Sequence, residues 1–258
     1  MDLKLTDKVV LITGSGQGLG KGIVRSFLKE GANALITDIH QDRINETLSE
    51  LKRDFPKNKV IAFCGDLTKQ NDIKLCVEYT LKSFGRIDIL IANLGSGRGT
   101  IEWNISEDDW TNMIELNFSG ARRITYEVIP AMMKQNGGSI IFISSIAGIE
   151  VIDAPIHYSV AKASIIVFSK NLSRKLARNN IRINTICPGN IYFENGTWDI
   201  KLKENMKKVL EILDTTVPQN RFASTEEIAN MVVFISSEKA SFVTGSCIII
   251  DGGQTTKI

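Results

Sequence analysis

Short apolar runs alternate with amphipathic segments along almost the whole chain, and this alternation constrains the fold more than any other feature of the sequence. The apolar run at residues 8–13, for example, precedes a segment at 19–29 whose apolar residues recur at helical spacing. Repetition of strand and helix in this order predicts an α/β fold, with a parallel sheet covered by helices on both faces. We expect seven strands, at residues 8–13, 33–38, 59–63, 87–92, 139–144, 181–187 and 246–250. Helices are expected at residues 19–29, 41–55, 69–84, 107–135, 157–179 and 225–236.

Length and composition indicate one domain over residues 1–258. With 43% hydrophobic residues the chain can bury one large core, and no linker-like run divides it. Its 31 basic and 29 acidic residues are interspersed, without a basic block that would follow a phosphate backbone, so nucleic acid is not an expected partner. The first residues carry acids where a signal peptide needs a basic start, and no run of about 18 apolar residues follows. A soluble, cytoplasmic protein that is not bound to a membrane is expected.

The histidines and cysteines do not indicate a metal site. The two histidines lie far apart, and the four cysteines form no Cys-x-x-Cys pair. We expect reduced thiols and no catalytic metal. His157 would point about 100° away from its neighbour around a helix, so it is interpreted as a surface or loop-packing residue.

A glycine-rich turn follows the first expected strand and opens the first expected helix. Gly14 permits a tight turn, Gly18 lets the backbone approach a pyrophosphate, and Gly20 allows close helix packing. Asp38, at the end of the second strand, is placed to accept hydrogen bonds from adenosine ribose hydroxyls. Because this carboxylate repels a 2′-phosphate and Gln17 supplies no cation to attract one, the expected cofactor is NAD rather than NADP. A helix N-cap is an alternative role for Asp38.

A tyrosine and a lysine four residues apart form the candidate acid–base pair. On a helix, Tyr158 and Lys162 lie on one face, so the phenol sits beside an ammonium. At ~4 Å and an effective dielectric of ~20 their attraction is on the order of 4 kcal/mol, which predicts a phenol pKa near ~7. Ser145 ends a strand-like run, which places its hydroxyl at the carboxyl end of a strand, within reach of a substrate oxygen. A solvated helix face is the alternative interpretation of a single Tyr-x-x-x-Lys spacing.

Six motifs spaced along the chain resemble those of the short-chain dehydrogenase/reductase family. They are Thr13-Gly14-x-x-x-Gly18-x-Gly20, Ala92-Asn93-Leu94-Gly95, Asn117, Ser145, Tyr158-x-x-x-Lys162 and Pro188-Gly189. The resemblance covers essentially the whole chain. It implies a single-domain, Rossmann-type, doubly wound sheet and hydride transfer between a nicotinamide cofactor and the carbon of a secondary alcohol or ketone. It also implies a homotetramer, and the apolar stripe of the helix expected at 157–179 is wider than one sheet face needs.

The resemblance assigns roles to individual residues. It makes Tyr158 the proton donor or acceptor, Ser145 the group that positions and polarises the substrate oxygen, and Lys162 the group that binds the nicotinamide ribose and lowers the phenol pKa. Asn117 would hold a water that links Lys162 to solvent. Adenine contacts are implied for Asp66 and Leu67, and main-chain contacts for Asn93 and Gly95. The complete set expected to bind the cofactor is Gly14, Gln17, Gly18, Leu19, Gly20, Asp38, Asp66, Leu67, Asn93, Gly95, Tyr158, Lys162, Pro188, Gly189 and Ile191.

Two positions depart from the family pattern. The usual Asn-Asn-Ala-Gly is replaced by Ala92-Asn93-Leu94-Gly95, so a bulky Leu94 is expected close to the cofactor. Phe193 stands where the family commonly has a threonine that bonds the nicotinamide carboxamide. The Ile191 main chain or Thr197 is the expected replacement for that anchor.

The segment at 190–220 is too long for a plain connection, so we expect a mobile lid that has helices of its own and closes over the substrate. Its first residues combine the amide, carboxylate and hydroxyl groups of Asn190, Glu194, Thr197 and Asp199 with the rings of Tyr192 and Trp198. Arg98, in another loop, is placed to contact an acidic or phosphorylated group. These features favour oxidation of a polar, sugar-like substrate with NAD. The alternative for the lid is a set of polar side chains that merely face solvent.

Two other functions are kept open. One is a 3-oxoacyl-thioester (acyl-carrier-protein) reductase, against which Asp38 argues because reductive steps usually draw on NADP. The other is an NAD-sensing protein without turnover, which would have little need for the four residues Asn117, Ser145, Tyr158 and Lys162.

Overall fold

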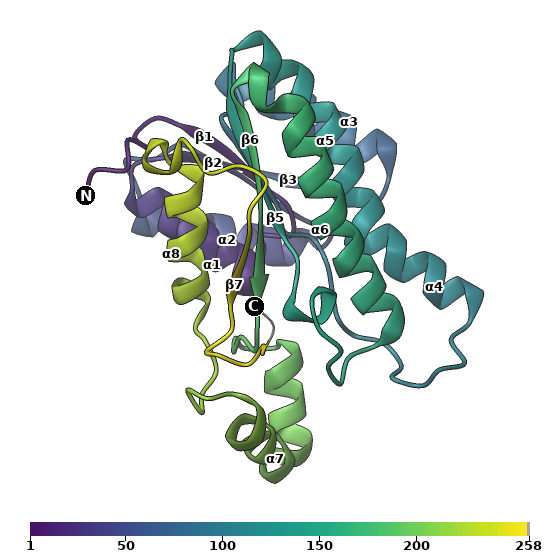
Figure 1. Cartoon of the computed structure of the whole chain (residues 1–258). Helices are drawn as coiled ribbons and strands as arrows, with labels where there is room; N and C mark the ends of the chain where they lie inside the picture. Colours follow the sequence, from purple (N-terminus) through teal and green to yellow (C-terminus); the bar gives the residue numbers. More distant parts are fainter. Residues whose placement is uncertain (257–258) are drawn as a thin grey trace.

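The computed structural model describes residues 1–256 and contains one seven-stranded, fully parallel sheet. The order of its strands is β3-β2-β1-β4-β5-β6-β7 (Figure 1). Because the chain winds outward in both directions from the central pair β1 and β4, the sheet is doubly wound, and the predicted α/β fold is confirmed. The strands are β1 (Val9–Ile12), β2 (Asn33–Asp38), β3 (Val60–Cys64), β4 (Ile89–Ala92), β5 (Gly138–Ile143), β6 (Ile181–Pro188) and β7 (Cys247–Ile250).

Helices cover both faces of this sheet, as the sequence predicted (Figure 1). On one face, α1 (Gly18–Lys29), α2 (Gln41–Asp54) and α8 (Thr225–Ser236) contribute to the first core. On the other face, α3 (Gln70–Phe84), α5 (Gly120–Lys134) and α6 (Ile156–Leu176) contribute to the second core.

Successive strand residues belong to different cores because side chains alternate across a pleated sheet. In β1, Val10 and Ile12 pack into the first core and Leu11 into the second, and all three are fully buried. A strand buried on both faces has to be apolar throughout, which is why the runs are continuous rather than alternating.

The helix expected at 107–135 is not uniform. It consists of α4 (Glu107–Ile114), a π-helical turn η1 (Glu115–Ser119) and α5. A π turn inserts one extra residue per hydrogen-bonded ring and rotates the side chains that it carries. Asn117 lies in the middle of this turn, so the irregularity redirects one of the residues assigned to the site.

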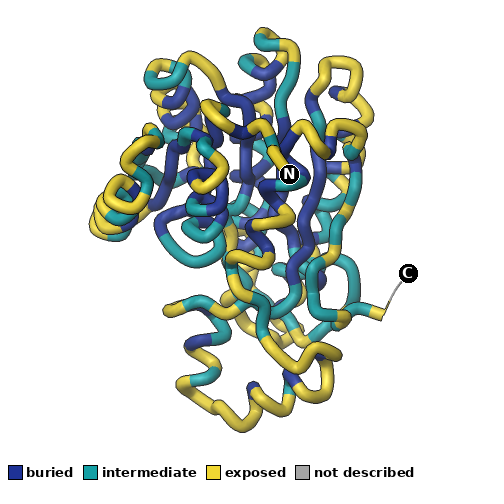
Figure 2. Tube along the Cα trace, turned by 90° about the vertical axis from the view of Figure 1, so that its left-hand side faces the viewer, coloured by how far each residue is buried: buried dark blue, intermediate teal, exposed yellow. Residues whose placement is uncertain are grey.

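The segment expected to form a lid contains α7 (Thr197–Thr216), which projects below the carboxyl ends of the strands (Figures 1 and 2). Its backbone is non-helical at Asn205, where a kink divides it. Only Asp199, Val209 and Leu213 of this helix are buried, and most of the projecting tube is exposed in Figure 2. The predicted helix in the lid is therefore present, and few buried contacts hold it to the body.

Within residues 1–256, every helix is too short or too polar to cross a membrane.

Candidate active site

A cleft of about 600 Å³ lies at the carboxyl edge of the sheet and brings together most of the predicted site. It opens beside the loops that follow β1 and β4, where the strand order reverses and where ligands of doubly wound sheets bind. The predicted residues that line it are Gly14, Gln17, Gly18, Leu19, Gly20, Asn93, Gly95, Ser145, Tyr158, Lys162, Pro188, Gly189 and Ile191. Four predicted residues, Asp38, Asp66, Leu67 and Asn117, do not line it.

The glycine-rich turn is packed so tightly that its glycines have no room for a Cβ. Gly18 has a φ of 55°, and a Cβ on Gly20 would lie 2.3 Å from the carbonyl oxygen of Gly14. Gly16, which the sequence analysis did not single out, is equally constrained, because its Cβ would lie 2.3 Å from Oδ2 of Asp38. The extra glycine in Thr-Gly-Ser-Gly was the available signal, since it allows the Asp38 carboxylate to lie directly against the turn.

Asn93 fastens the turn after β1 to the loop after β4. Its Nδ2 donates to the carbonyl oxygens of Thr13 and Gly14, both at 2.9 Å. The hydroxyl of Thr13 accepts from the backbone N–H of Asn93 and of Leu94, again at 2.9 Å. Leu94 packs on Gly14 and against the second core and does not itself line the cleft, and its closeness to the cofactor stays a prediction. The second core draws its apolar side chain inward.

Asp38 is buried against the glycine-rich turn, next to Gly16. Its Oδ1 accepts the backbone N–H of His40 at 2.9 Å, and both carboxylate oxygens pair with Nη1 of Arg43 at 3.2 and 3.3 Å. His40 and Arg43 line the cleft, whereas Asp38 does not. The N-cap position of α2 is His40, so Asp38 is not the cap. Arg43 was missed because nothing in the sequence spacing marks a helix residue that folds back onto a strand end.

Tyr158 and Lys162 lie on one face of α6, as predicted. The Nζ of Lys162 donates to the carbonyl oxygen of Ile143 at 3.0 Å and lies 5.6 Å from the centroid of the Tyr158 ring. Lys162 is 3% exposed, and desolvation by burial lowers its pKa to about 8.

The predicted fall in the phenol pKa is wrong for the protein alone. Tyr158 is half-buried in the cleft wall, and desolvation raises its pKa, an effect that a hydrogen bond with Ser145 only partly opposes. Burial disfavours the charged forms of the phenol and of the ammonium alike. The Lys162 ammonium is also directed at a carbonyl oxygen, so proximity along the helix does not by itself ionise the phenol.

Ser145 follows β5 at the carboxyl edge, as predicted, and is the N-cap of the short helix η2 (Ile146–Gly148). Its Oγ accepts the backbone N–H of Ala147 at 3.1 Å and lines the cleft. The adjacent Ser144 donates from its hydroxyl to the carbonyl oxygen of Lys162 at 2.8 Å. These contacts hold the end of β5 against α6.

Asn117 is fully buried beside Lys162. Its Oδ1 accepts the backbone N–H of Ser96 at 3.0 Å, and its Nδ2 donates to the carbonyl oxygens of Ser96 and Met113 at 3.0 and 3.2 Å. A Cβ on Gly95 would lie 2.5 Å from Oδ1 of Asn117 and 3.0 Å from Nζ of Lys162. Gly95 therefore allows the two side chains to converge, while the Asn117 amide holds the loop after β4.

Asp66 and Leu67 follow β3 but do not reach the cleft. Oδ1 of Asp66 accepts the backbone N–H and the hydroxyl of Thr68 at 2.9 and 2.7 Å, which forms a local turn. Leu67 is 4% exposed and belongs to the second core. Their contact with adenine stays a prediction.

Phe193 reaches from the lid to the glycine-rich turn. A Cβ on Gly18 would lie 2.6 Å from Cε2 of Phe193, so the ring lies directly on this glycine. Thr197 also lines the cleft, and Ile191 forms a parallel bridge with Ala223. The segment at 190–220 is thus anchored beside the glycine-rich turn.

His157 is enclosed by the residues around it. His157 is 1% exposed and packs edge-on against Trp110, with ring centroids 5.8 Å apart, so of the two expected positions it takes the loop-packing one. In the part of the chain that the structure describes, no three His, Cys, Asp or Glu residues lie close enough to hold a metal ion.

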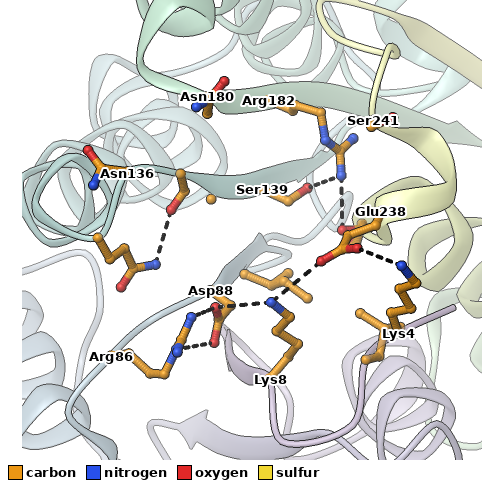
Figure 3. Close-up of a pocket in the computed structure, with 16 residues that line it drawn as sticks. Lys4, Lys8, Arg86, Asp88, Asn136, Ser139, Asn180, Arg182, Glu238 and Ser241 are labelled. Carbon is orange, nitrogen blue, oxygen red and sulfur yellow. Dashed lines mark hydrogen bonds and ion pairs between the residues drawn. The ribbon is translucent and has the colours of Figure 1, made fainter.

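A second cavity, of about 330 Å³, lies at the opposite, amino edge of the sheet (Figure 3). Asp88 pairs there with Arg86 and Lys8, and accepts the backbone N–H of Val9. Arg182 donates to the carbonyl oxygens of residues 235–237 and 243. These contacts join the strand starts to the end of α8, and the cavity contains none of the predicted catalytic residues.

The comparisons with known proteins agree with this geometry. A family model described as enoyl-(acyl carrier protein) reductase matches residues 14–255. The chain is 35% identical to a 3-oxoacyl-(acyl-carrier-protein) reductase from Thermotoga maritima, over 97% of this chain and 99% of that protein. The chain belongs to the short-chain dehydrogenase/reductase family.

Solved structures extend the comparison. The L-sorbose reductase of Gluconobacter frateurii, complexed with NADPH and L-sorbose, matches with a TM-score of 0.95 and 33% identity over the full length of both chains. A 7α-hydroxysteroid dehydrogenase complexed with NADH and 7-oxo glycochenodeoxycholic acid matches with a TM-score of 0.90 and 27% identity, over 99% of this chain and 97% of that one. The chain is an oxidoreductase of this family, and its relatives include complexes with either nicotinamide cofactor.

The lowered pKa of Lys162 predicts a pH-dependent contribution to stability. Because the unfolded chain binds this proton more tightly, the free energy of unfolding should rise with pH between about 8 and 10.5. Between about pH 7 and about pH 9.5 the free energy of unfolding of the wild type should rise by about 2 kcal/mol more than that of Lys162→Met, measured by urea unfolding. Lys175→Met, at an exposed position of the same helix, should leave the slope unchanged. Parallel profiles for wild type and Lys162→Met would contradict the assignment.

Proposed function

We propose that the protein is an NAD(H)-dependent oxidoreductase that interconverts a secondary alcohol and a ketone. The observation that carries this proposal is the convergence of Ser145, Tyr158 and Lys162 with the glycine-rich turn in one cleft. A protein that only senses NAD would have no use for a phenol, a hydroxyl and a buried lysine aimed at the same space. The non-catalytic alternative is therefore disfavoured.

The cleft suits a nicotinamide cofactor. The turn from Gly14 to Gly20 has no room for a Cβ on Gly20, and its backbone lies at the start of α1, where N–H groups attract a pyrophosphate. When bound, the cofactor accepts or donates a hydride at the substrate carbon. Of the predicted binding residues, those that line the cleft are proposed to hold it, and Asp66 and Leu67 would do so only after a local rearrangement.

The remaining chemistry is a proton transfer by the chain's own residues. In the oxidative direction the phenolate oxygen of Tyr158 takes the proton of the substrate hydroxyl, and in the reductive direction the neutral phenol gives its proton to the ketone oxygen. Ser145 Oγ, at the end of β5, orients the same oxygen by a hydrogen bond. Lys162 stabilises the phenolate as it forms, and Asn117 keeps the neighbouring loop in place so that a water has access to Lys162.

NAD is proposed as the preferred cofactor because the Asp38 carboxylate lies against Gly16, where the adenosine ribose belongs. NADP is the second candidate, because the Arg43 guanidinium lies at the cleft wall, where it pairs with Asp38. A guanidinium that leaves this pair has the geometry to bind a 2′-phosphate. The L-sorbose reductase with its NADPH ligand supports the same alternative.

A polar, hydroxylated substrate is proposed. The substrate end of the cleft is lined by Ser96, Asp153, Asn190, Thr197 and Trp198, groups that bond hydroxyls and stack on a sugar ring. Glu194, expected among these residues, is exposed and does not line the cleft. The likeness to L-sorbose reductase supports this class, whereas the relative from Thermotoga maritima supports reduction of a 3-oxoacyl thioester as the alternative.

A cytoplasmic homotetramer, with residues 190–220 acting as its substrate lid, completes the proposal. Most of the apolar stripe of α6 that was expected at the subunit interface packs inside the subunit, because Ile165 and Leu176 are buried and Phe168 packs against the second core. Other apolar residues of α6 remain open, since Val160 and Val167 are 43% and 63% exposed. They support subunit contact through this helix.

Replacing Tyr158 by phenylalanine should abolish turnover and leave cofactor binding nearly intact. The substitution removes only the phenolic oxygen, so the proton transfer is lost while the ring still packs, and kcat should fall by about 10² to 10⁴-fold. Steady-state kinetics measure the first effect, and titration of NAD by intrinsic fluorescence measures the second. Activity within a few-fold of wild type would contradict the role of Tyr158.

Two substitutions at the adenosine end should change cofactor preference in opposite directions. Asp38→Ala should narrow the preference for NAD by removing the charge that repels a 2′-phosphate and by freeing Arg43. Arg43→Gln should widen that preference. The measurement is the ratio of kcat/KM for NAD and NADP, and a wild-type ratio that favours NADP would contradict the argument from Asp38.

The assembly is tested by light scattering on the purified protein at micromolar concentration. A mass four times that of the chain is expected. Val167→Lys should reduce that mass, because it places a charge in the apolar contact. A wild-type mass of one chain would contradict the tetramer.

A further inference from the structure

The loop after β4 presents an arginine at the substrate end of the cleft. Arg98 lines the cleft, and its Nη2 donates to the carbonyl oxygen of Asn195, in the lid, at 2.8 Å. A guanidinium has five N–H donors in a rigid fork. One backbone carbonyl satisfies one of them and cancels none of the charge.

A lysine of the lid helix lines the same cleft, and its partner Trp198 lies three residues after Asn195, the partner of Arg98. Lys201 lines the cleft from α7, and its Nζ lies 4.8 Å from the centroid of the Trp198 ring. The Trp198 ring is itself packed on Phe222, with centroids 5.3 Å apart. The indole face holds the ammonium in place by a cation–π contact, and like the carbonyl beside Arg98 it carries no net charge.

Two other cations near the cleft, unlike Arg98 and Lys201, are neutralised by ion pairs. Lys203, two residues further along α7, pairs with Asp199 at 2.7 Å. Asp199 also accepts from the hydroxyl of Tyr192 and from the backbone N–H of Asn195, so its acceptors are already in use. Arg43, at the adenosine end, pairs with Asp38.

Within residues 1–256, Arg98 and Lys201 take part in no ion pair. Among the described residues that line the cleft, Asp153 is the only carboxylate. Glu194 lies on the Tyr192 and Lys203 side of the lid, outside the lining. Arg98 and Lys201 therefore set two cations against one carboxylate in the cleft lining, and all three side chains are open to solvent and to a ligand.

We propose that Arg98 and Lys201 form a subsite for an anionic group of the substrate, a carboxylate or a phosphate ester. This inference rests on the proposed function, since the same hydroxylated molecule would carry the carbinol that Tyr158 deprotonates. The fork of Arg98 matches either group in a bidentate manner, and Lys201 adds a point charge from the lid. Because one residue comes from the body and the other from the lid, a bound anion would connect the two and favour the closed arrangement.

The test compares three compounds with one carbon skeleton: a neutral polyol, the corresponding aldonate and the terminal phosphate monoester. Each is assayed with NAD for wild type, Arg98→Gln and Lys201→Gln. Lys207→Gln, at an exposed position of the same helix outside the cleft lining, is the matched control, and Arg98→Lys tests charge without the fork. The absorbance of the reduced nicotinamide gives kcat and KM separately.

We expect kcat/KM for an anionic compound to exceed that of the polyol at least about tenfold, and to fall as ionic strength rises. Arg98→Gln should lower kcat/KM for that compound by about 10 to 100-fold, mainly through KM, and change the value for the polyol by less than about threefold. Lys201→Gln should act in the same direction more weakly, Arg98→Lys should restore part of the loss, and Lys207→Gln should have no effect. Whichever anionic compound is preferred identifies the group.

A binding readout separates this inference from the proposed function. Quenching of Trp198 fluorescence reports binding of the aldonate or phosphate ester without turnover, because Lys201 lies on that ring. The contribution of Trp198 is obtained by subtracting the fluorescence of Trp198→Phe. Anion-dependent quenching that Arg98→Gln removes, together with no turnover of any compound, would uphold the subsite and refute the proposed reaction. The subsite would be refuted, and the reaction left standing, by either of two results. One is a kcat/KM for the polyol that equals the values for the anionic compounds, and the other is an equal fall in kcat/KM for all three compounds in Arg98→Gln.

Discussion

The clasp between the end of β5 and the helix α6 is the contact on which the rest of the site depends. Lys162 Nζ donates to the carbonyl oxygen of Ile143, and the hydroxyl of Ser144 donates to the carbonyl oxygen of Lys162. The two bonds cross between the same elements in opposite directions, so they fix both the height and the rotation of α6. Tyr158, one turn earlier, is thereby held above Ser145.

This clasp requires a lysine to be almost completely buried, which costs free energy unless the charge is lost or satisfied. The hydrogen bond to the Ile143 carbonyl oxygen partly offsets that cost, and the part that is not offset lowers the pKa of Lys162. A group poised in this way can gain or lose a proton near neutral pH, which is the property that an acid–base site needs. The same desolvation raises the pKa of Tyr158, so burial disfavours the phenolate in the protein alone.

Charge is distributed unevenly along the cleft. At the adenosine end, Asp38 and Arg43 neutralise each other beside the glycine-rich turn. At the substrate end, Arg98 and Lys201 are positioned by a carbonyl oxygen and an indole ring and keep their charge. In the proposed function the neutral pair would set the choice between two similar cofactors, whereas the uncompensated charge would attract a ligand of opposite sign. The two ends therefore suit different kinds of recognition.

The seven strands, their alternation with helices and the residues at the carboxyl edge of the sheet could all be predicted from the sequence. These follow from apolar periodicity, glycine spacing and chain order, all of which are local. The tertiary structure alone decided the contacts between elements: the approach of Asp38 to Gly16, the return of Arg43 onto Asp38 and the inward turn of Leu94. It also reversed the expected direction of the Tyr158 pKa, because spacing along a helix places two groups together but does not measure how much water surrounds them. Desolvation is a property of the packed cleft, and no stretch of sequence contains it.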